Sequence, residues 1–162
     1  LEPGGYRLIA DTAPVGGPDL VLTVDLVVPG NTPGQPMPEP TGTVTVDGLD
    51  VTLDLVPSPE GIVAELTVRR DGTVIEPDPY LGARGHIVAI AASDLGYLHV
   101  HPTEGAGPVT FAVALPAPGR YRLFFDFSVD GQVRTAAFTV ALDADSTAEP
   151  ADDHGHPDGE GH

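Results

Sequence analysis

Apolar and polar residues alternate with a period of two over much of the chain. The clearest run is LDVTLDL (49–55), where Leu and Val fill the odd positions and Asp and Thr fill the even positions. Such alternation indicates a strand with one face in a core and the other in water. Apolar and β-branched segments predict further strands at 5–10, 20–28, 61–70, 86–92, 95–101, 109–115, 120–129 and 132–142. No segment has a helical period, so the pattern predicts an all-β protein.

The last two predicted strands are joined by Asp130-Gly131, which is a strong signal for a two-residue hairpin turn. This turn places Phe125 opposite Ala136 on an apolar face that we expect in the core. Asp126 then lies on the reverse face, because successive side chains alternate. The spacing of the strands is typical of an antiparallel β-sandwich.

Composition divides the chain into three segments. Residues 1–47 contain two predicted strands and a linker at 29–40 with five prolines, and we expect them to pack on the main domain. Residues 48–142 form the predicted β-sandwich, which would bind metal. Residues 143–162 contain seven acids and no large apolar residue, so we expect a disordered acidic tail.

The charge is strongly acidic, with 24 Asp and Glu against 7 Arg and no Lys, for a net charge of −17. Nucleic acid and anionic membranes are therefore not expected as partners, and a metal cation is the more natural ligand. The chain has no Cys, which excludes disulfides, thiolate zinc sites and a blue-copper centre.

No apolar run is long enough to span a membrane as a helix. The chain begins with Leu1 instead of Met, from which we expect that it has been processed and that a signal or anchor lay upstream. The predicted location is extracytoplasmic, either secreted or attached to the cell envelope.

Three of the six histidines lie in two predicted strands, HIVAIAA (86–92) and LGYLHVH (95–101). With Ser93-Asp94 as the turn, Val88 pairs with His99, and His86 faces His101. All three imidazoles would then lie on one side of one hairpin, with opposed Cβ atoms about 4.5 to 5.5 Å apart. A shift of one residue would move His86 to the other face.

Three imidazoles without sulfur are suited to Cu(II), with Zn(II) as the alternative. The fourth ligand could be water or a carboxylate, and Asp126 is the candidate if its strand lies beside the hairpin. Alternatively, Asp126 pairs with Arg122 or Arg134, and the histidines are incidental. Arg84 would repel a cation, since it lies two residues before His86 on the same face.

The other three histidines are in the tail, at His154, His156 and His162. Together with nearby carboxylates they could bind Cu(II), Ni(II) or Zn(II) weakly, because Gly lets the chain wrap around an ion. The alternative is a tail that only increases solubility. Metal affinity should fall below about pH 6.5, since imidazole must be neutral to act as a ligand.

The segments YLGARGHIVAI, DLGYLHVHP and GRYRLFFDF, in this order, resemble the YtkA-like domain of small bacterial envelope proteins associated with copper and other heavy metals. The resemblance covers about residues 80–141 and implies an immunoglobulin-like (cupredoxin-like) sandwich. It also implies a metal site at His86, His99 and His101, with Asp126 as a further matched position whose role is open. The N-terminal region, 1–46, departs from the family pattern, and its role stays open.

The leading hypothesis is a non-catalytic metal-binding protein of the bacterial cell envelope that binds Cu(II) for copper handling or resistance. The alternative is an immunoglobulin-like structural or interaction module that contacts another envelope protein. An enzyme is not expected, because the chain lacks a Ser/His/Asp arrangement and a Gly-rich phosphate loop.

Overall fold

The computed structural model describes residues 1–12, 14–18, 20–31, 34, 36–59, 61–103, 107–115 and 117–143. The side chains of His99 and His101 are outside this description, although their backbone is within it. Residues 144–162 are also outside, so the predicted disorder of the tail and its weak site at His154, His156 and His162 are not tested.

The described residues form eleven strands and no helix. The strands are β1 (Gly4–Thr12), β2 (Leu20–Val28), β3 (Thr43–Val46), β4 (Leu49–Ser58), β5 (Gly61–Arg70), β6 (Thr73–Ile75), β7 (His86–Ala91), β8 (Tyr97–Thr103), β9 (Val109–Val113), β10 (Gly119–Val129) and β11 (Gln132–Leu142). The all-β prediction is therefore confirmed. β3 and β6 were not predicted, because strands of four and three residues are too short to show a period.

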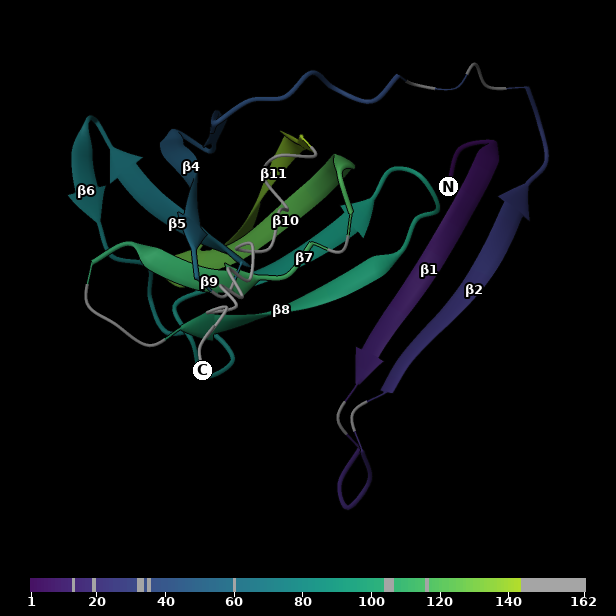
Figure 1. Cartoon of the computed structure of the whole chain (residues 1–162), viewed down its shortest axis with the longest axis horizontal. Coiled ribbons are helices and arrows are strands. Elements are labelled where there is room, and N and C mark those ends of the chain that lie inside the picture. The colour runs from purple at the N-terminus through teal and green to yellow at the C-terminus, as the bar shows by residue number, and fades with distance from the viewer. Residues whose placement is uncertain are drawn as a thin grey trace, which may run out of the picture.

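The strands from β3 onward follow the order β11-β10-β7-β8-β9-β5-β4-β3, with β6 paired to β5 (Figure 1). All of these pairs are antiparallel, and the arrangement is consistent with a β-sandwich. One layer contains β11, β10, β7 and β8, and the other contains β9, β5, β4, β3 and β6. β8 belongs to both layers, because it pairs with β7 up to Val100 and with β9 from His101.

The core lies between the two layers and contains the predicted inward faces. Leu49, Val51 and Leu53 of β4 are buried, as the alternation predicts. Phe125 stacks on Phe127 at a centroid distance of 5.0 Å and meets Phe111 edge to face at 6.0 Å. These aromatic contacts connect β10 in one layer to β9 in the other.

The β10–β11 hairpin has the predicted register, with Phe125 opposite Ala136 and Asp126 opposite Thr135. Its turn residues Asp130 and Gly131 both have positive φ, at 53° and 70°. Positive φ at both positions is what a type I′ turn requires, which explains the preference for Asp-Gly. Since the core face is fixed in this way, Asp126 lies on the outer face of the sheet.

β1 and β2 form a separate two-stranded antiparallel sheet, which stands to one side of the sandwich in Figure 1. Polar contacts connect it to the β7–β8 hairpin. Arg7 donates to the backbone carbonyl of Asp94 at 2.8 Å, and the hydroxyl of Tyr97 donates to Asp11 at 2.6 Å.

The described residues between positions 29 and 40 form no strand. None of the described residues forms a helix that is long and apolar enough to cross a membrane.

Candidate metal centre

The β7–β8 hairpin has the predicted register, with Val88 opposite His99 and Ala89 opposite Leu98. The turn, however, is not the predicted two-residue turn. Leu95 N–H donates to the carbonyl of Ala91 at 3.0 Å, and Leu95 has a φ of +58°. The loop between the closing pair is therefore 92–95.

The longer loop preserves the register because it adds one residue on each side of Ser93-Asp94. Its shape is stabilised locally, since Oδ1 of Asp94 accepts a hydrogen bond of 2.8 Å from the N–H of Gly96. A side-chain oxygen that accepts from the backbone two residues on is a common way for Asp to stabilise a turn. The face of each residue is thus as predicted, although the turn is not.

The expected opposition of His86 and His101 is not one of the strand pairs. The β7–β8 pairs end at Ile87 and Val100, and His101 pairs with Ala112 of β9 instead. β8 has to leave β7 here because it passes into the second layer. His101 therefore occupies the corner between the layers, one position beyond the last pair with β7.

The strand on the other side of β7 is β10, and this pairing places Asp126 directly opposite His86. Both side chains are half-buried, on the outer face of the layer. Directly opposed residues have Cβ atoms about 4.5 to 5.5 Å apart. The adjacency that a four-residue site requires is therefore present between β7 and β10.

Gly85 allows β7 to start close to β10 at this point. A Cβ atom at Gly85 would lie 2.3 Å from Cε2 of Phe125 and 3.1 Å from the carbonyl oxygen of Asp126. Because the ring of Phe125 is fully buried, it has little room to move away. The Gly-His pair thus combines a close approach of two strands with the first histidine of the site.

Tyr80 orients His86. The Nε2 atom of His86 lies 3.0 Å from the carbonyl oxygen of Tyr80, and the two rings meet edge to face at 5.8 Å. Since a carbonyl only accepts, Nε2 carries the proton in this contact and Nδ1 keeps its lone pair. Metal-binding histidines commonly donate their second N–H to a carbonyl in this way. Sequence patterning did not single out Tyr80, because its hydrogen bond with His86 uses the backbone carbonyl.

Asp126 accepts a hydrogen bond from the hydroxyl of Thr135, its partner on β11. The alternative that Asp126 pairs with Arg122 or Arg134 finds no support among the described contacts. Arg122 donates to Thr139 at 2.6 Å and lies over the ring of Phe124, 5.4 Å from its centroid.

Arg134 is also engaged elsewhere, since it donates to the carbonyl of Val129 at 2.9 Å and lies 3.2 Å from Asp47. Arg84 was expected to repel a cation, and it has contacts of its own. It donates to the carbonyl of Gly107 at 3.1 Å and approaches Glu76 at 3.5 Å.

Of the four predicted ligands, His86 and Asp126 have side chains that the structure describes, and the two residues lie side by side. Within the part of the chain whose side chains are described, no group of three or more His, Cys, Asp or Glu residues is placed to hold a metal ion. His99 and His101 enter only through backbone register, so the complete ligand set stays a prediction.

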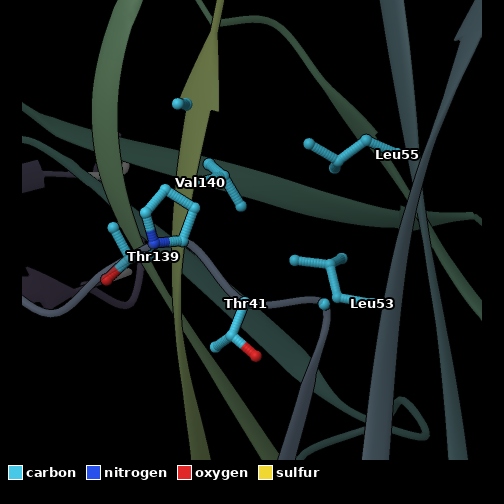
Figure 2. A pocket seen from close by; sticks show the side chains of 8 residues that line it. Thr41, Leu53, Leu55, Thr139 and Val140 are labelled. Atoms are coloured by element: carbon cyan, nitrogen blue, oxygen red, sulfur yellow. The ribbon is translucent and has the colours of Figure 1, made fainter.

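A pocket of about 260 Å³ lies elsewhere, at the seam between β4 and β11 (Figure 2). Leu53 and Leu55 line it from β4, Thr139 and Val140 line it from β11, and the remaining lining residues are Pro40, Thr41, Gly42 and Ala141. No imidazole or carboxylate is among the residues that line this pocket.

Ionisable groups also surround the turn of the histidine hairpin. Burial, followed by the hydrogen bond to Asp11, raises the pKa of Tyr97. Arg7 forms two hydrogen bonds with Asp25, at 2.7 and 3.1 Å. Hydrogen bonding to Arg7 lowers the pKa of Asp25. Charge-assisted contacts thus hold the N-terminal hairpin at the β7–β8 turn, at the opposite end of β7 from His86.

The fold and the pairing of His86 with Asp126 define an all-β domain with a histidine and a carboxylate side by side on an outer strand face. A family model described as "Domain of unknown function (DUF8832)" matches residues 44–144, and the chain belongs to this family. The match begins within β3, ends just after β11 and leaves β1 and β2 outside. Comparisons with curated proteins and with solved structures found no match.

Proposed function

We propose that this protein is a non-catalytic metal-binding protein that binds Cu(II) through His86, His99, His101 and Asp126. The observation that carries the proposal is the direct pairing of His86 with Asp126 across β7 and β10. The register of β8 supports it, because His99 pairs with Val88, the outer-face residue two positions from His86. The residues come from three strands.

The chemistry of these donors favours copper. Imidazole nitrogens with one carboxylate suit Cu(II), and copper binds more tightly than zinc at a given nitrogen site. The contact between His86 and Tyr80 leaves Nδ1 of His86 as the ligating atom. The hydroxyl of Thr135 would hold one oxygen of Asp126 and leave the other for the ion.

A copper titration of a variant without tail histidines tests the proposal. In the full chain, His154, His156 and His162 are replaced by Ala, so that the remaining histidines are those of the hairpin. We expect one Cu(II) per chain and an electron paramagnetic resonance spectrum with nitrogen couplings. Adding His99→Ala and His101→Ala should weaken binding by at least about 100-fold, in line with the loss of two ligands. Equal stoichiometry and affinity in both proteins would exclude the hairpin site.

The type of sandwich and the cellular location are part of the same proposal. The sandwich is assigned as immunoglobulin-like (cupredoxin-like), and the protein is placed outside the cytoplasm, secreted or attached to the bacterial envelope, where it would serve copper handling or resistance. The motif resemblance over about 80–141 supports this assignment. Fractionation of cells that produce the complete protein, with detection in the periplasmic or envelope fraction, tests the location.

An interaction module is the second candidate function, and the exposed apolar side chains of β1 and β2 favour it. It predicts that protein purified without added metal contains none by elemental analysis and gains none tightly on titration. It also predicts a partner that can be crosslinked to the N-terminal hairpin.

A further inference from the structure

The two faces of the β1–β2 hairpin differ in charge and in their contacts with the sandwich. The odd-numbered residues of β1 contain Arg7 and Asp11, which contact the sandwich at Asp94 and Tyr97. Since side chains alternate, the even-numbered residues point away from the sandwich. One face of the hairpin is thus used within the chain, and the other is not.

The unused face is apolar and exposed. Leu8 pairs with Val24 at its centre, and Ala10 pairs with Leu22 beside them. We call this surface the even face, and its large members are Leu8 at 48% exposed, Leu20 at 42%, Leu22 at 59%, Val24 at 61% and Leu26 at 39%. The even face has no charged residue, and its other members are Gly4, Tyr6, Ala10, Thr12 and Val28. Soluble proteins rarely expose a contiguous apolar face of this kind without a partner.

The chain's own sandwich does not cover the even face. The contacts of Arg7 and Asp11 turn the opposite face of the hairpin toward the β7–β8 turn. In Figure 1 the hairpin stands beside the sandwich, with β1 nearer to it than β2. The residues after β11 are acidic and lack large apolar side chains, so they are a poor cover for Leu and Val.

A lipid bilayer is also a poor occupant. The net charge of −17 opposes an anionic surface. In addition, β1 and β2 pair only with each other among the described strands, so each has one edge with unpaired backbone groups. Such groups cannot enter hydrocarbon without a large loss of hydrogen bonding.

We propose that the even face binds the even face of a second copy of this chain, around a two-fold axis near Val24. Two such faces are self-complementary, because flat rows of Leu and Val meet the same rows and no charge is buried. The edges of β1 and β2 stay in water, where their backbone groups are satisfied.

The small area of the even face limits the strength of this dimer. The five large side chains expose on the order of 400 Å² per copy, so a dimer buries about 800 to 1,000 Å² in total. This is at the low end for specific interfaces, so we expect dissociation in the micromolar range. Because each copy is strongly acidic, raising the salt concentration should strengthen the dimer by screening repulsion.

Analytical ultracentrifugation of the full chain tests the proposal. We expect a monomer–dimer equilibrium over about 1 to 200 μM, which spans the affinity expected for this area. Val24→Asp should raise the dimer dissociation constant by more than about 10-fold, because it buries a charge at the centre of the interface. The matched control is Val27→Asp, which puts the same charge on the opposite face of β2 and should leave the constant unchanged.

Disulfide crosslinking gives a second readout, because the natural chain has no Cys. Val24→Cys should form a crosslinked dimer on mild oxidation, whereas Thr23→Cys on the other face should not. A chain that stays monomeric at 200 μM, about the top of the range set by the area, would overturn the proposal. So would a dimer that Val24→Asp leaves intact, or a Thr23→Cys crosslink as efficient as that of Val24→Cys.

Discussion

At the scale of single residues, a substitution at Asp126 tests whether this side chain binds metal or has only a structural role. Asp126→Asn keeps an oxygen for the hydroxyl of Thr135 but removes the negative charge. If Asp126 is a ligand, Cu(II) affinity should fall by about 10- to 100-fold while thermal stability changes little, as expected when a first ligand is neutralised. The matched control is Asp54→Asn, an exposed carboxylate on β4. Equal losses of affinity in the two variants would indicate a general effect of charge.

Gly85 gives a prediction about stability. Gly85→Ala would place a methyl group 2.3 Å from the buried ring of Phe125, so β7 or the ring has to shift. Overpacking of this kind costs about 1 to 3 kcal/mol of unfolding free energy. Urea unfolding followed by circular dichroism measures this cost. Gly5→Ala serves as the comparison, because Gly5 is exposed on β1 and an added Cβ there would meet nothing within 4 Å.

At the scale of elements, sequence periodicity predicted most strands and the register of both key hairpins. The predicted register of β7 and β8 is correct although the predicted turn is wrong, because the observed loop is longer by one residue on each side. Sequence could not predict that β10 lies beside β7, since that pairing joins residues 30 to 40 positions apart and depends on the order of strands in the sheet. It also could not predict the corner at His101, where β8 changes layers.

The contact between Tyr97 and Asp11 predicts how the N-terminal hairpin responds to pH. The pKa of Tyr97 is raised above its usual value of about 10, first by burial and then by this hydrogen bond. A raised pKa contributes stability that is complete below about pH 10 and is lost as the pH rises through the folded value. Alkaline solution should therefore release the hairpin from the β7–β8 turn.

Absorbance at 295 nm, which reports tyrosinate, measures this titration. The difference between the wild-type protein and Tyr97→Phe isolates the one phenol, and Asp11→Asn should shift its titration to lower pH. If the difference spectrum titrates near pH 10 in both backgrounds, about the ordinary value for Tyr, Asp11 does not hold the phenol.

At the scale of the whole molecule, the proposed site and the tail differ in their dependence on folding. His86, His99 and Asp126 lie on three strands, so they come together only in the folded sandwich. The tail histidines are close in sequence, so we expect a tail site to offer the same donors in the folded and unfolded chain. A ligand stabilises a protein only when it binds the folded state in preference to the unfolded state.

Thermal unfolding with and without Cu(II) therefore shows which site binds the metal. Copper at 100 times the dissociation constant of the folded site should add about 2.7 kcal/mol to the unfolding free energy and raise the melting temperature. Replacing His154, His156 and His162 with Ala should leave this increase intact, whereas His99→Ala with His101→Ala should remove it. If copper binds without any increase in melting temperature, the tail holds the ion, because binding that is equal in both states cannot shift the equilibrium.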